Sequence, residues 1–122
     1  MVLVPGFLLR RLYARGTLRN TDQGVEFQLR NRLGSGYAEA LLPLTVDGVD
    51  MPMQTCSFSV DGEATCFDQV SADRPFTLAL NRETTVTVQG LFLTEELHTI
   101  GMGFQVPGLG ILQFDFTNLP TR

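Results

Sequence analysis

The chain has 122 residues, the size of one ordinary domain, and 43% of them are apolar, which argues against disorder. The formal net charge is −4 at pH 7, and all nine basic residues are arginine. Six arginines and two carboxylates lie in residues 1–32, whereas the remainder holds three arginines and eleven carboxylates. The overall acidity, with no aromatic series among the arginines, argues against nucleic acid as a partner.

The apolar opening of the chain predicts neither a secretory signal nor a membrane anchor. Pro5 and Gly6 interrupt it, and Arg10 and Arg11 follow the apolar stretch instead of preceding it. The stretch is also too short to span a bilayer. We therefore expect a cytoplasmic protein that does not associate with a membrane.

The first predicted element is a β-hairpin. Residues 12–19 and 25–30 alternate apolar and polar side chains on either side of a turn at residues 20–23. Facing residues of an antiparallel pair share one face, so the loop length predicts the register. The apolar face is expected to pair Leu18 with Val25, Gly16 with Phe27 and Ala14 with Leu29. The polar face is expected to pair Thr17 with Glu26, Arg15 with Gln28, Tyr13 with Arg30 and Arg11 with Arg32.

This polar face is the first candidate site, formed by Arg11, Tyr13, Arg15, Arg30 and Arg32. Two arginines that face each other repel, which favours an acidic counterpart, and a tyrosine ring supports an arginine by stacking. One alternative is a solvated face whose long side chains splay apart. The other is a docking surface for a carboxylate-rich protein or an anionic ligand.

Two Val-Asp-Gly sequences, at residues 46–48 and 60–62, predict tight hairpin turns. Residues 37–46, before the first turn, are expected to form a strand that Pro43 interrupts. The number of residues in the second turn decides whether the two cysteines lie on the same face of the sheet. A two-residue loop points Cys56 and Cys66 to opposite faces, whereas a three-residue loop sets them opposite each other. A disulfide is thus geometrically allowed, but we expect reduced thiols, no metal site and no cysteine nucleophile.

The second half of the chain predicts one helical turn within residues 67–75, followed by further strands. His98 opens a strand, and we expect it to form hydrogen bonds at the strand end. These strands are expected at residues 76–80, 83–88, 98–106 and 111–117.

The last two of these strands contain the second candidate site. The turn at residues 107–110 predicts that Phe104 lies near Phe114 and Met102 near Phe116. The opposite face then carries Gly101, Gly103, Gln113 and Asp115. Glycines on one strand face mark the close approach of another backbone or of a ligand, so Gly101, Gly103 and Asp115 form a candidate ligand patch.

Together these elements predict an all-β chain. We expect residues 1–122 to form a single-domain antiparallel β-sandwich of about eight strands with at most one short helical turn, and a closed barrel is the alternative. No phosphate-binding loop, nucleophile elbow or metal cluster is seen in the sequence. We therefore expect no cofactor, no metal and no enzymatic activity of the chain on its own.

The order of the hairpin motifs resembles that of the small β subunit of the C-glycoside deglycosidases. The motifs are Tyr13-x-x-Gly16-x-Leu18, residues 24–30, residues 44–48, residues 59–63 and residues 93–100. This resemblance implies a β-sandwich subunit that packs on a larger barrel subunit. The larger subunit would carry the metal and the catalytic base that cleave the carbon–carbon bond of an oxidised C-glycoside. It assigns no catalytic residue to this chain.

A second segment, residues 12–21, is similar to small proteins labelled hydroxymethylglutaryl-coenzyme A reductase. Such an activity requires a nicotinamide site and a catalytic lysine. The chain has no lysine and no dinucleotide fingerprint, so the label does not describe its activity.

Two hypotheses of different class follow. The first, which we favour, is a non-catalytic interaction module that forms a homo-oligomer or serves as the accessory subunit of a larger catalytic subunit. It would use the arginine face or the apolar N-terminus. The second is a small ligand-binding or carbohydrate-active sandwich, similar to a lyase or isomerase, with a site near Asp115.

Overall fold

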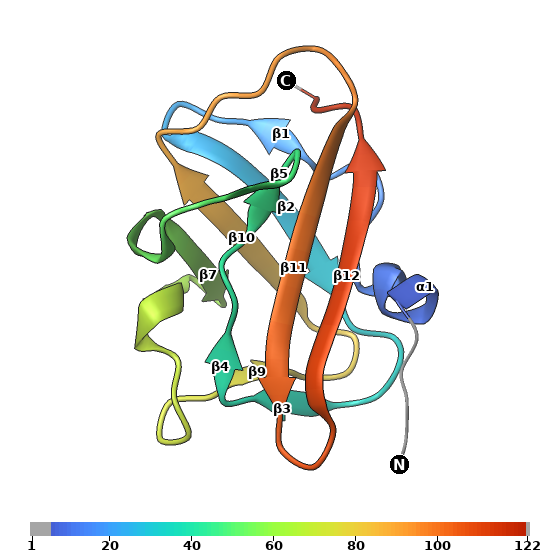
Figure 1. Cartoon of the computed structure of the whole chain (residues 1–122), viewed down its shortest axis with the longest axis vertical. Helices are drawn as coiled ribbons and strands as arrows, with labels where there is room; N and C mark the ends of the chain where they lie inside the picture. The colour runs from blue at the N-terminus through green and yellow to red at the C-terminus, as the bar shows by residue number, and fades with distance from the viewer. Residues whose placement is uncertain (1–5, 122) are drawn as a thin grey trace.

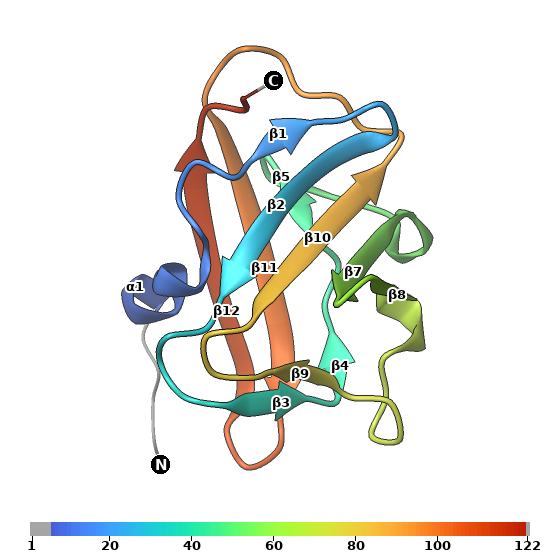
Figure 2. The same ribbon diagram turned by 180° about the vertical axis from the view of Figure 1, so that it is seen from behind.

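The computed structural model describes residues 6–121 and has two antiparallel sheets packed face to face (Figure 1). The first sheet contains, in spatial order, β1 (Arg19–Asn20), β2 (Gly24–Arg30), β10 (Glu83–Gln89), β7 (Cys56–Val60) and β8 (Glu63–Cys66). The second contains β12 (Gly110–Asn118), β11 (His98–Val106), β5 (Thr45–Val46) and β6 (Val49–Asp50), and β4 (Ala40–Leu41) also pairs with β11. Figure 2 shows the first sheet from the other side.

A two-stranded ribbon of β3 (Gly36–Ala38) and β9 (Phe76–Leu78) closes one end of the sandwich. The helical elements are α1 (Gly6–Leu9) and the single 3₁₀ turns η1 (Arg10–Leu12), η2 (Met53–Thr55) and η3 (Phe67–Gln69). The third of these is the helical turn expected within residues 67–75. Residues 6–121 form twelve strands, four of them only two residues long, and none of their sheets closes into a barrel. The predicted antiparallel sandwich is confirmed.

The core lies between the sheets because alternate side chains of each strand point inward. In β2, Val25, Phe27 and Leu29 are buried, whereas the residues between them are partly exposed. This alternation is the period of a strand with one buried face. The other long strands contribute Val86, Val88, Ile100, Met102, Phe104, Phe114 and Phe116.

Three aromatic rings join the N-terminal segment to both sheets. The ring of Tyr13 stacks on Phe116 of β12 with centroids 3.6 Å apart, and Phe27 of β2 meets Phe116 edge to face at 5.1 Å. The Tyr13 hydroxyl also accepts a hydrogen bond from the Leu18 main-chain N–H at 3.2 Å. Tyr13 is therefore a core residue, and its expected place on a polar face beside Arg30 is wrong.

The first hairpin differs from its predicted register. Arg19 pairs with Glu26 and Asn20 with Val25, two residues beyond the expected partners, and Tyr13 bridges to Leu29. Two local features cause the shift. A tight turn closes the hairpin with a hydrogen bond from Thr21 N–H to the Gly24 carbonyl, and residues 10–12 form η1 instead of a strand. The predicted pairs of Tyr13 with Arg30 and of Arg11 with Arg32 therefore do not form.

The last hairpin keeps the predicted faces but also shifts by two residues. Met102 pairs with Phe114 and Phe104 with Leu112, so Phe104 and Phe114, like Met102 and Phe116, are diagonal neighbours on one face and not direct partners. The strands extend further toward the loop than expected, because Gly110 at φ +86° closes the hairpin against Val106 after three loop residues. Gly101 lies opposite Asp115, and Gly103 opposite Gln113. The predicted common face of these four residues is confirmed.

Both Val-Asp-Gly turns have two-residue loops. Val46 pairs with Val49 and Val60 with Glu63, and each Asp-Gly pair has two positive φ angles, as in type I′ turns. The second turn pairs Cys66 with Ser57 instead of Cys56, and both cysteines are free thiols. The cross-strand arrangement of Cys56 and Cys66 that a three-residue loop would have produced is therefore wrong.

Two further expectations concern the strand around Pro43 and helices long enough to span a membrane. The strand predicted for residues 37–46 is interrupted around Pro43, between β4 and β5, as expected. No helix within residues 6–121 is long and apolar enough to cross a membrane. Expectations for residues 1–5, including the apolar opening of the chain, lie outside the described residues.

We predict that Phe116→Ala lowers the free energy of unfolding by about 3–5 kcal/mol, because the substitution removes the ring that contacts both Tyr13 and Phe27. Urea unfolding followed by circular dichroism measures the change. Phe7→Ala is the matched control, since Phe7 is 70% exposed and its loss should cost no more than about 0.5 kcal/mol. Equal effects of the two substitutions would contradict this account of the core.

Candidate functional site: the ridge beside strand β12

Residues 6–12 form a short ridge, α1 followed by η1, along the outer edge of β12 (Figure 1). Leu9 and Leu12 are buried, which holds the ridge against the sandwich. Phe7, Arg10 and Arg11 point away from the core and are exposed. The buried residues Leu9 and Leu12 are three positions apart, which is the spacing of residues on one face of a helix. This spacing explains why the segment is helical and not part of the following strand.

Arg10 links the ridge to the edge strand. Its Nε donates a hydrogen bond of 2.6 Å to the main-chain carbonyl of Asp115, and its Nη2 lies 3.2 Å from the Asp115 carboxylate. Both side chains are at least half exposed, so the ion pair itself adds little stability. The contact to the carbonyl matters more, because unpaired backbone groups of an edge strand invite pairing with another chain. Arg10 therefore covers part of this edge.

The first hollow beside Arg10 contains the whole candidate ligand patch. This hollow has a volume of about 440 Å³ and is lined by Arg10, Thr45, Gly101, Gly103 and Asp115, among others. The structure thus brings the three predicted patch residues together. Arg10 and Thr45 also line this hollow, although the sequence did not predict them as part of the patch.

Neighbouring side chains explain the two glycines of this patch. A Cβ atom on Gly101 would overlap the Thr45 hydroxyl oxygen, and one on Gly103 would lie 2.7 Å from Leu42 Cδ1. Thr45 and Leu42 come from the segment that pairs with β11. The glycines therefore accommodate side chains of an adjacent segment, which is neither the backbone nor the ligand expected for them, and no ligand is needed to account for them.

The second hollow beside Arg10 unites part of the predicted arginine face. It has a volume of about 400 Å³, and Phe7, Arg10, Arg11, Tyr13 and Arg15 line it together with the end of β12. Arg11, Tyr13 and Arg15 thus meet as predicted, although Tyr13 takes part from the core. Phe7 belongs to the apolar N-terminus expected as the alternative interaction surface, whereas Arg10 was missed. The helical spacing of Leu9 and Leu12 is the signal in the sequence that could have placed Arg10 on the outer side of the segment.

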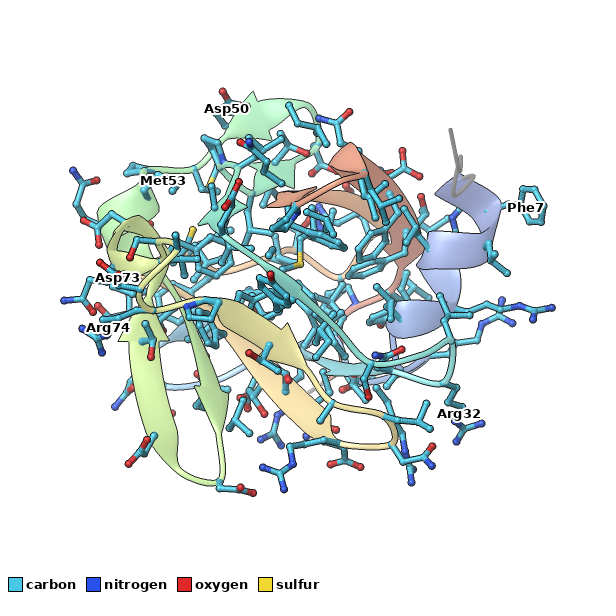
Figure 3. All side chains as sticks on the ribbon, turned by 90° about the horizontal axis from the view of Figure 1, so that it is seen from below. Phe7, Arg32, Asp50, Met53, Asp73 and Arg74 are labelled. Atoms are coloured by element: carbon cyan, nitrogen blue, oxygen red, sulfur yellow. The ribbon has the colours of Figure 1, made fainter. Side chains whose placement is uncertain are left out.

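The other two predicted arginines do not line this hollow. Arg30 ends β2 opposite Glu83 of β10, and within residues 6–121 its buried Nε has no hydrogen-bond partner. Arg32 follows in the loop after β2 and is exposed at the rim of the molecule (Figure 3). The five residues predicted as one face are therefore divided, because η1 replaces the strand on which Arg11 was expected.

The positive charge of this region is only partly neutralised. Residues 6–21 contain four arginines and no carboxylate. Arg10 pairs with Asp115, and Arg19 donates a hydrogen bond of 2.6 Å to Glu26. Within residues 6–121, Arg11 and Arg15 form no ion pair and are exposed. They leave two positive charges beside the exposed ring of Phe7.

His98 forms a separate network at the start of β11. Its Nδ1 lies 2.7 Å from the Asp47 carboxylate, and its Nε2 lies 3.1 Å from the Thr94 carbonyl. Asp47 also accepts a hydrogen bond from the Thr99 N–H at 2.9 Å. The predicted hydrogen-bonding role of His98 is confirmed, whereas the sequence presented Asp47 only as a turn residue. The Thr94 hydroxyl, which can donate or accept, also lies 3.1 Å from Nε2. The Asp47 carboxylate and the Thr94 carbonyl only accept, so a protonated imidazole can donate a hydrogen bond from each ring nitrogen.

The pKa values of this pair shift in opposite directions. The hydrogen bond to Asp47 raises the pKa of His98, and the Thr94 carbonyl and nearby Glu96 act in the same direction, against a lowering by burial. The hydrogen bonds from His98 and Thr99 lower the pKa of Asp47. The pair therefore favours a charged histidine next to a charged aspartate.

The two cysteines are not activated for chemistry. Burial raises the pKa of Cys56 and also that of Cys66, so both are protonated thiols at neutral pH. Within residues 6–121, no three side chains of His, Cys, Asp and Glu gather in a group that could hold a metal ion.

We predict that Gly101→Ala destabilises the fold by about 1–3 kcal/mol, because the added methyl group overlaps the Thr45 hydroxyl. In the double variant with Thr45→Ala the overlap is relieved, so adding Gly101→Ala to Thr45→Ala should cost nearly nothing. Urea unfolding of the four proteins gives the coupling energy. A Gly101→Ala variant as stable as the wild type would show that the strand segment bearing Thr45 does not require glycine here.

We also predict a pH-dependent contribution of the His98–Asp47 pair to stability. Because the pKa of His98 is raised, the stabilisation by the charged histidine is complete below pH 6.5, its ordinary pKa. This stabilisation is lost as the pH rises through the pKa of His98 in the folded protein. Because the pKa of Asp47 is lowered, the stabilisation by the charged aspartate is complete above pH 3.8, its ordinary pKa. This stabilisation is lost as the pH falls through the pKa of Asp47 in the folded protein. The stability difference between wild type and Asp47→Asn should therefore be largest between these two limits.

Urea unfolding from about pH 3 to pH 9 measures this difference. Asp61→Asn is the matched control, since Asp61 occupies the same place in the other Asp-Gly turn but pairs with Arg82 at 2.8 Å. Arginine keeps its charge throughout, so the effect of this control should not change above about pH 6. A constant effect of Asp47→Asn between pH 5 and pH 9 would contradict the proposed ionisation of His98.

Comparison with known families identifies the chain at the level of family. The family model described as hydroxymethylglutaryl-CoA reductase, N-terminal domain, matches residues 8–119. No curated protein matches the chain. The match overturns the expectation of a C-glycoside deglycosidase β subunit and agrees with the second resemblance, carried by residues 12–21. The family is that of a non-catalytic module of a larger enzyme. The chain belongs to the hydroxymethylglutaryl-CoA reductase N-terminal domain family.

Proposed function

We propose that this chain is a non-catalytic interaction module that docks onto a carboxylate-rich surface of a larger enzyme through its ridge. The observation that carries the proposal is the exposed ring of Phe7, 70% accessible, beside the unneutralised charges of Arg11 and Arg15. The family supports it, because it is described as the N-terminal domain of hydroxymethylglutaryl-CoA reductase.

The chemistry of the ridge suits a protein partner. Aromatic and arginine side chains are enriched at protein interfaces, where a ring fills a pocket and a guanidinium binds carboxylates in a bidentate manner. Leu9 and Leu12 fix the ridge on the sandwich, so Phe7 and Arg11 are presented on a folded support. A rigid support lowers the entropic cost of binding.

We do not extend the proposal to a ligand at Asp115. The hollow is present, but Arg10 already binds the Asp115 carboxylate and carbonyl. Thr45 and Leu42 account for Gly101 and Gly103. The features that suggested a ligand or a lyase-like site thus have local structural causes.

We infer a cytoplasmic location for the module. The support is that Cys56 and Cys66 are free thiols. Proteins of oxidising compartments more commonly have paired cysteines. Alkylation of unreduced protein isolated from its source should label both thiols after unfolding.

We predict that Arg11→Glu combined with Arg15→Glu abolishes docking, because it places carboxylates against the carboxylates of the partner. The wild-type chain, used as bait in an extract of its source organism, should retain a large enzyme subunit that quantitative mass spectrometry detects. The double variant should retain at least about tenfold less of this subunit than the wild type does. Retention should also fall as salt rises from about 50 to about 300 mM.

Arg74→Glu is the control for this experiment. Arg74 is exposed and lies on the opposite side of the molecule from α1 (Figure 3), so this variant should bind like the wild type. Light scattering of the purified chain tests the alternative partner. A salt-sensitive dimer that the double variant abolishes would make a second copy the partner, whereas a wild-type monomer that retains no protein would refute docking altogether.

A further inference from the structure

The second hollow beside Arg10, the one that Arg11 and Arg15 line, has a strand edge as one of its walls. Thr117 and Asn118, at the end of β12, line this hollow together with the ridge. β12 is the outermost strand of its sheet, so among residues 6–121 no strand pairs with its outer side. A strand edge of this kind offers main-chain N–H and C=O groups to an added strand.

The main-chain groups of Thr117 point out of this edge. In an antiparallel pair, alternate residues direct their N–H and C=O groups toward the neighbouring strand, and the residues between them direct theirs away. The Asp115 carbonyl faces away from β11, because it accepts a hydrogen bond of 2.6 Å from the Nε of Arg10. Thr117 lies two residues further along β12, so its N–H and C=O groups face the same way. The residue opposite Thr117, Thr99, agrees with this pattern, because its carbonyl accepts the Asp47 N–H on the other side of β11.

The ridge binds the edge at Asp115 but leaves the main chain of Thr117 open. Arg10 occupies the Asp115 carbonyl. Beyond the ladder of β11 and β12, Thr117 forms a hydrogen bond within residues 6–121 only through its side-chain hydroxyl, at 2.8 Å. One N–H and one C=O are therefore available to a segment that enters the hollow.

The side chains that line the hollow complement an acidic and partly apolar segment. Arg11 and Arg15 line it and form no ion pair within residues 6–121. Phe7 lines it as well and is 70% exposed. Successive side chains of an extended segment point to opposite sides. A segment that combines carboxylates with apolar residues can therefore meet both kinds of surface while its main chain pairs with the strand edge.

We propose that the docking partner inserts an extended segment into this hollow, where one residue pairs with the main chain of Thr117 and neighbouring carboxylates bind Arg11 and Arg15. The paired residue donates its N–H to the Thr117 carbonyl and accepts the Thr117 N–H, as facing residues of an antiparallel pair do. Docking on a flat acidic surface would use the arginines alone, whereas this mode also uses the strand edge. The inference rests on the proposed function and specifies how the partner binds.

Peptide selection followed by hydrogen exchange tests the proposal. A phage-displayed library of random 12-residue peptides is selected on the immobilised wild-type chain and depleted on the variant with Arg11→Glu and Arg15→Glu. The selected peptides should contain aspartate or glutamate next to large apolar residues. A saturating selected peptide should slow exchange of the Thr117 N–H at least about tenfold in NMR spectra of the chain, because this N–H becomes hydrogen-bonded.

Ile111 is the internal control for this measurement. It lies an even number of residues before Thr117 on β12, so its N–H also faces away from β11. It is exposed, but it does not line the hollow. Exchange of the Ile111 N–H should therefore have the same rate with and without peptide.

Substitution by proline tests the same contact through affinity. Thr117→Pro removes the outward N–H at an edge position, where proline is tolerated, and should weaken peptide binding at least about tenfold in fluorescence anisotropy. Thr117→Val keeps this N–H and should bind like the wild type, as should Ile111→Pro. Circular dichroism verifies the fold of each variant. If a proline variant does not fold, the exchange measurement on the wild-type chain decides.

Three outcomes would overturn the inference. Selected peptides without carboxylates would exclude this occupant. Peptides that bind without slowing exchange at Thr117 would show that side chains dock alone; Thr117→Pro would then retain the enzyme subunit, so docking stands and strand pairing fails. Protection of Thr117 in the free chain that rises with protein concentration would assign the edge to a second copy. If the wild-type chain retains no enzyme subunit, docking itself fails, and this inference fails with it.

Discussion

The flat contact between the rings of Tyr13 and Phe116, at a centroid distance of 3.6 Å, determines where the N-terminal segment lies. Phe27 meets both rings edge to face, so residues from the first sheet, the second sheet and the N-terminal segment share one cluster. Aromatic contacts of this kind combine a large buried area with a preferred geometry. Once Tyr13 is held there, the preceding η1 and α1 must lie beside β12.

The ridge lies against a sheet edge that would otherwise be open. β12 is an edge strand of nine residues, and a long free edge exposes backbone groups that pair readily with other chains. The ridge covers part of this edge, and Arg10 binds the Asp115 carbonyl there. The same arrangement leaves Phe7, Arg11 and Arg15 directed outward. Protection of the edge and presentation of the proposed docking surface therefore depend on the same few residues.

The two Asp-Gly turns show how one local motif serves different ends. Asp61 pairs with Arg82 on the surface, whereas Asp47 binds His98 and the backbone of Thr99 and so ties the turn to the start of β11. The positions of both turns were predictable, because Asp-Gly strongly favours a hairpin turn, whereas the sequence left the loop length of the second turn open. The partner of each aspartate was not predictable, because it comes from a strand remote in the sequence.

The sequence by itself determined the periodicity of the strands, the positions of the Asp-Gly turns and the shared face of Gly101, Gly103, Gln113 and Asp115, since these depend on neighbours along the chain. The two-residue loop of the second turn was decided only by the structure. Only the tertiary structure decided the register of both hairpins. In the last hairpin a shift of two residues preserves both faces, so periodicity cannot detect it. In the first hairpin the bridge from Tyr13 to Leu29 brings Tyr13 from the expected polar face into the core. The tertiary structure also decided that Tyr13 enters the core while Arg11 and Arg15 meet Phe7 and Arg10 around one hollow. Residues 10–12 form a 3₁₀ turn, and packing against β12 selected it over the strand that alternation favoured.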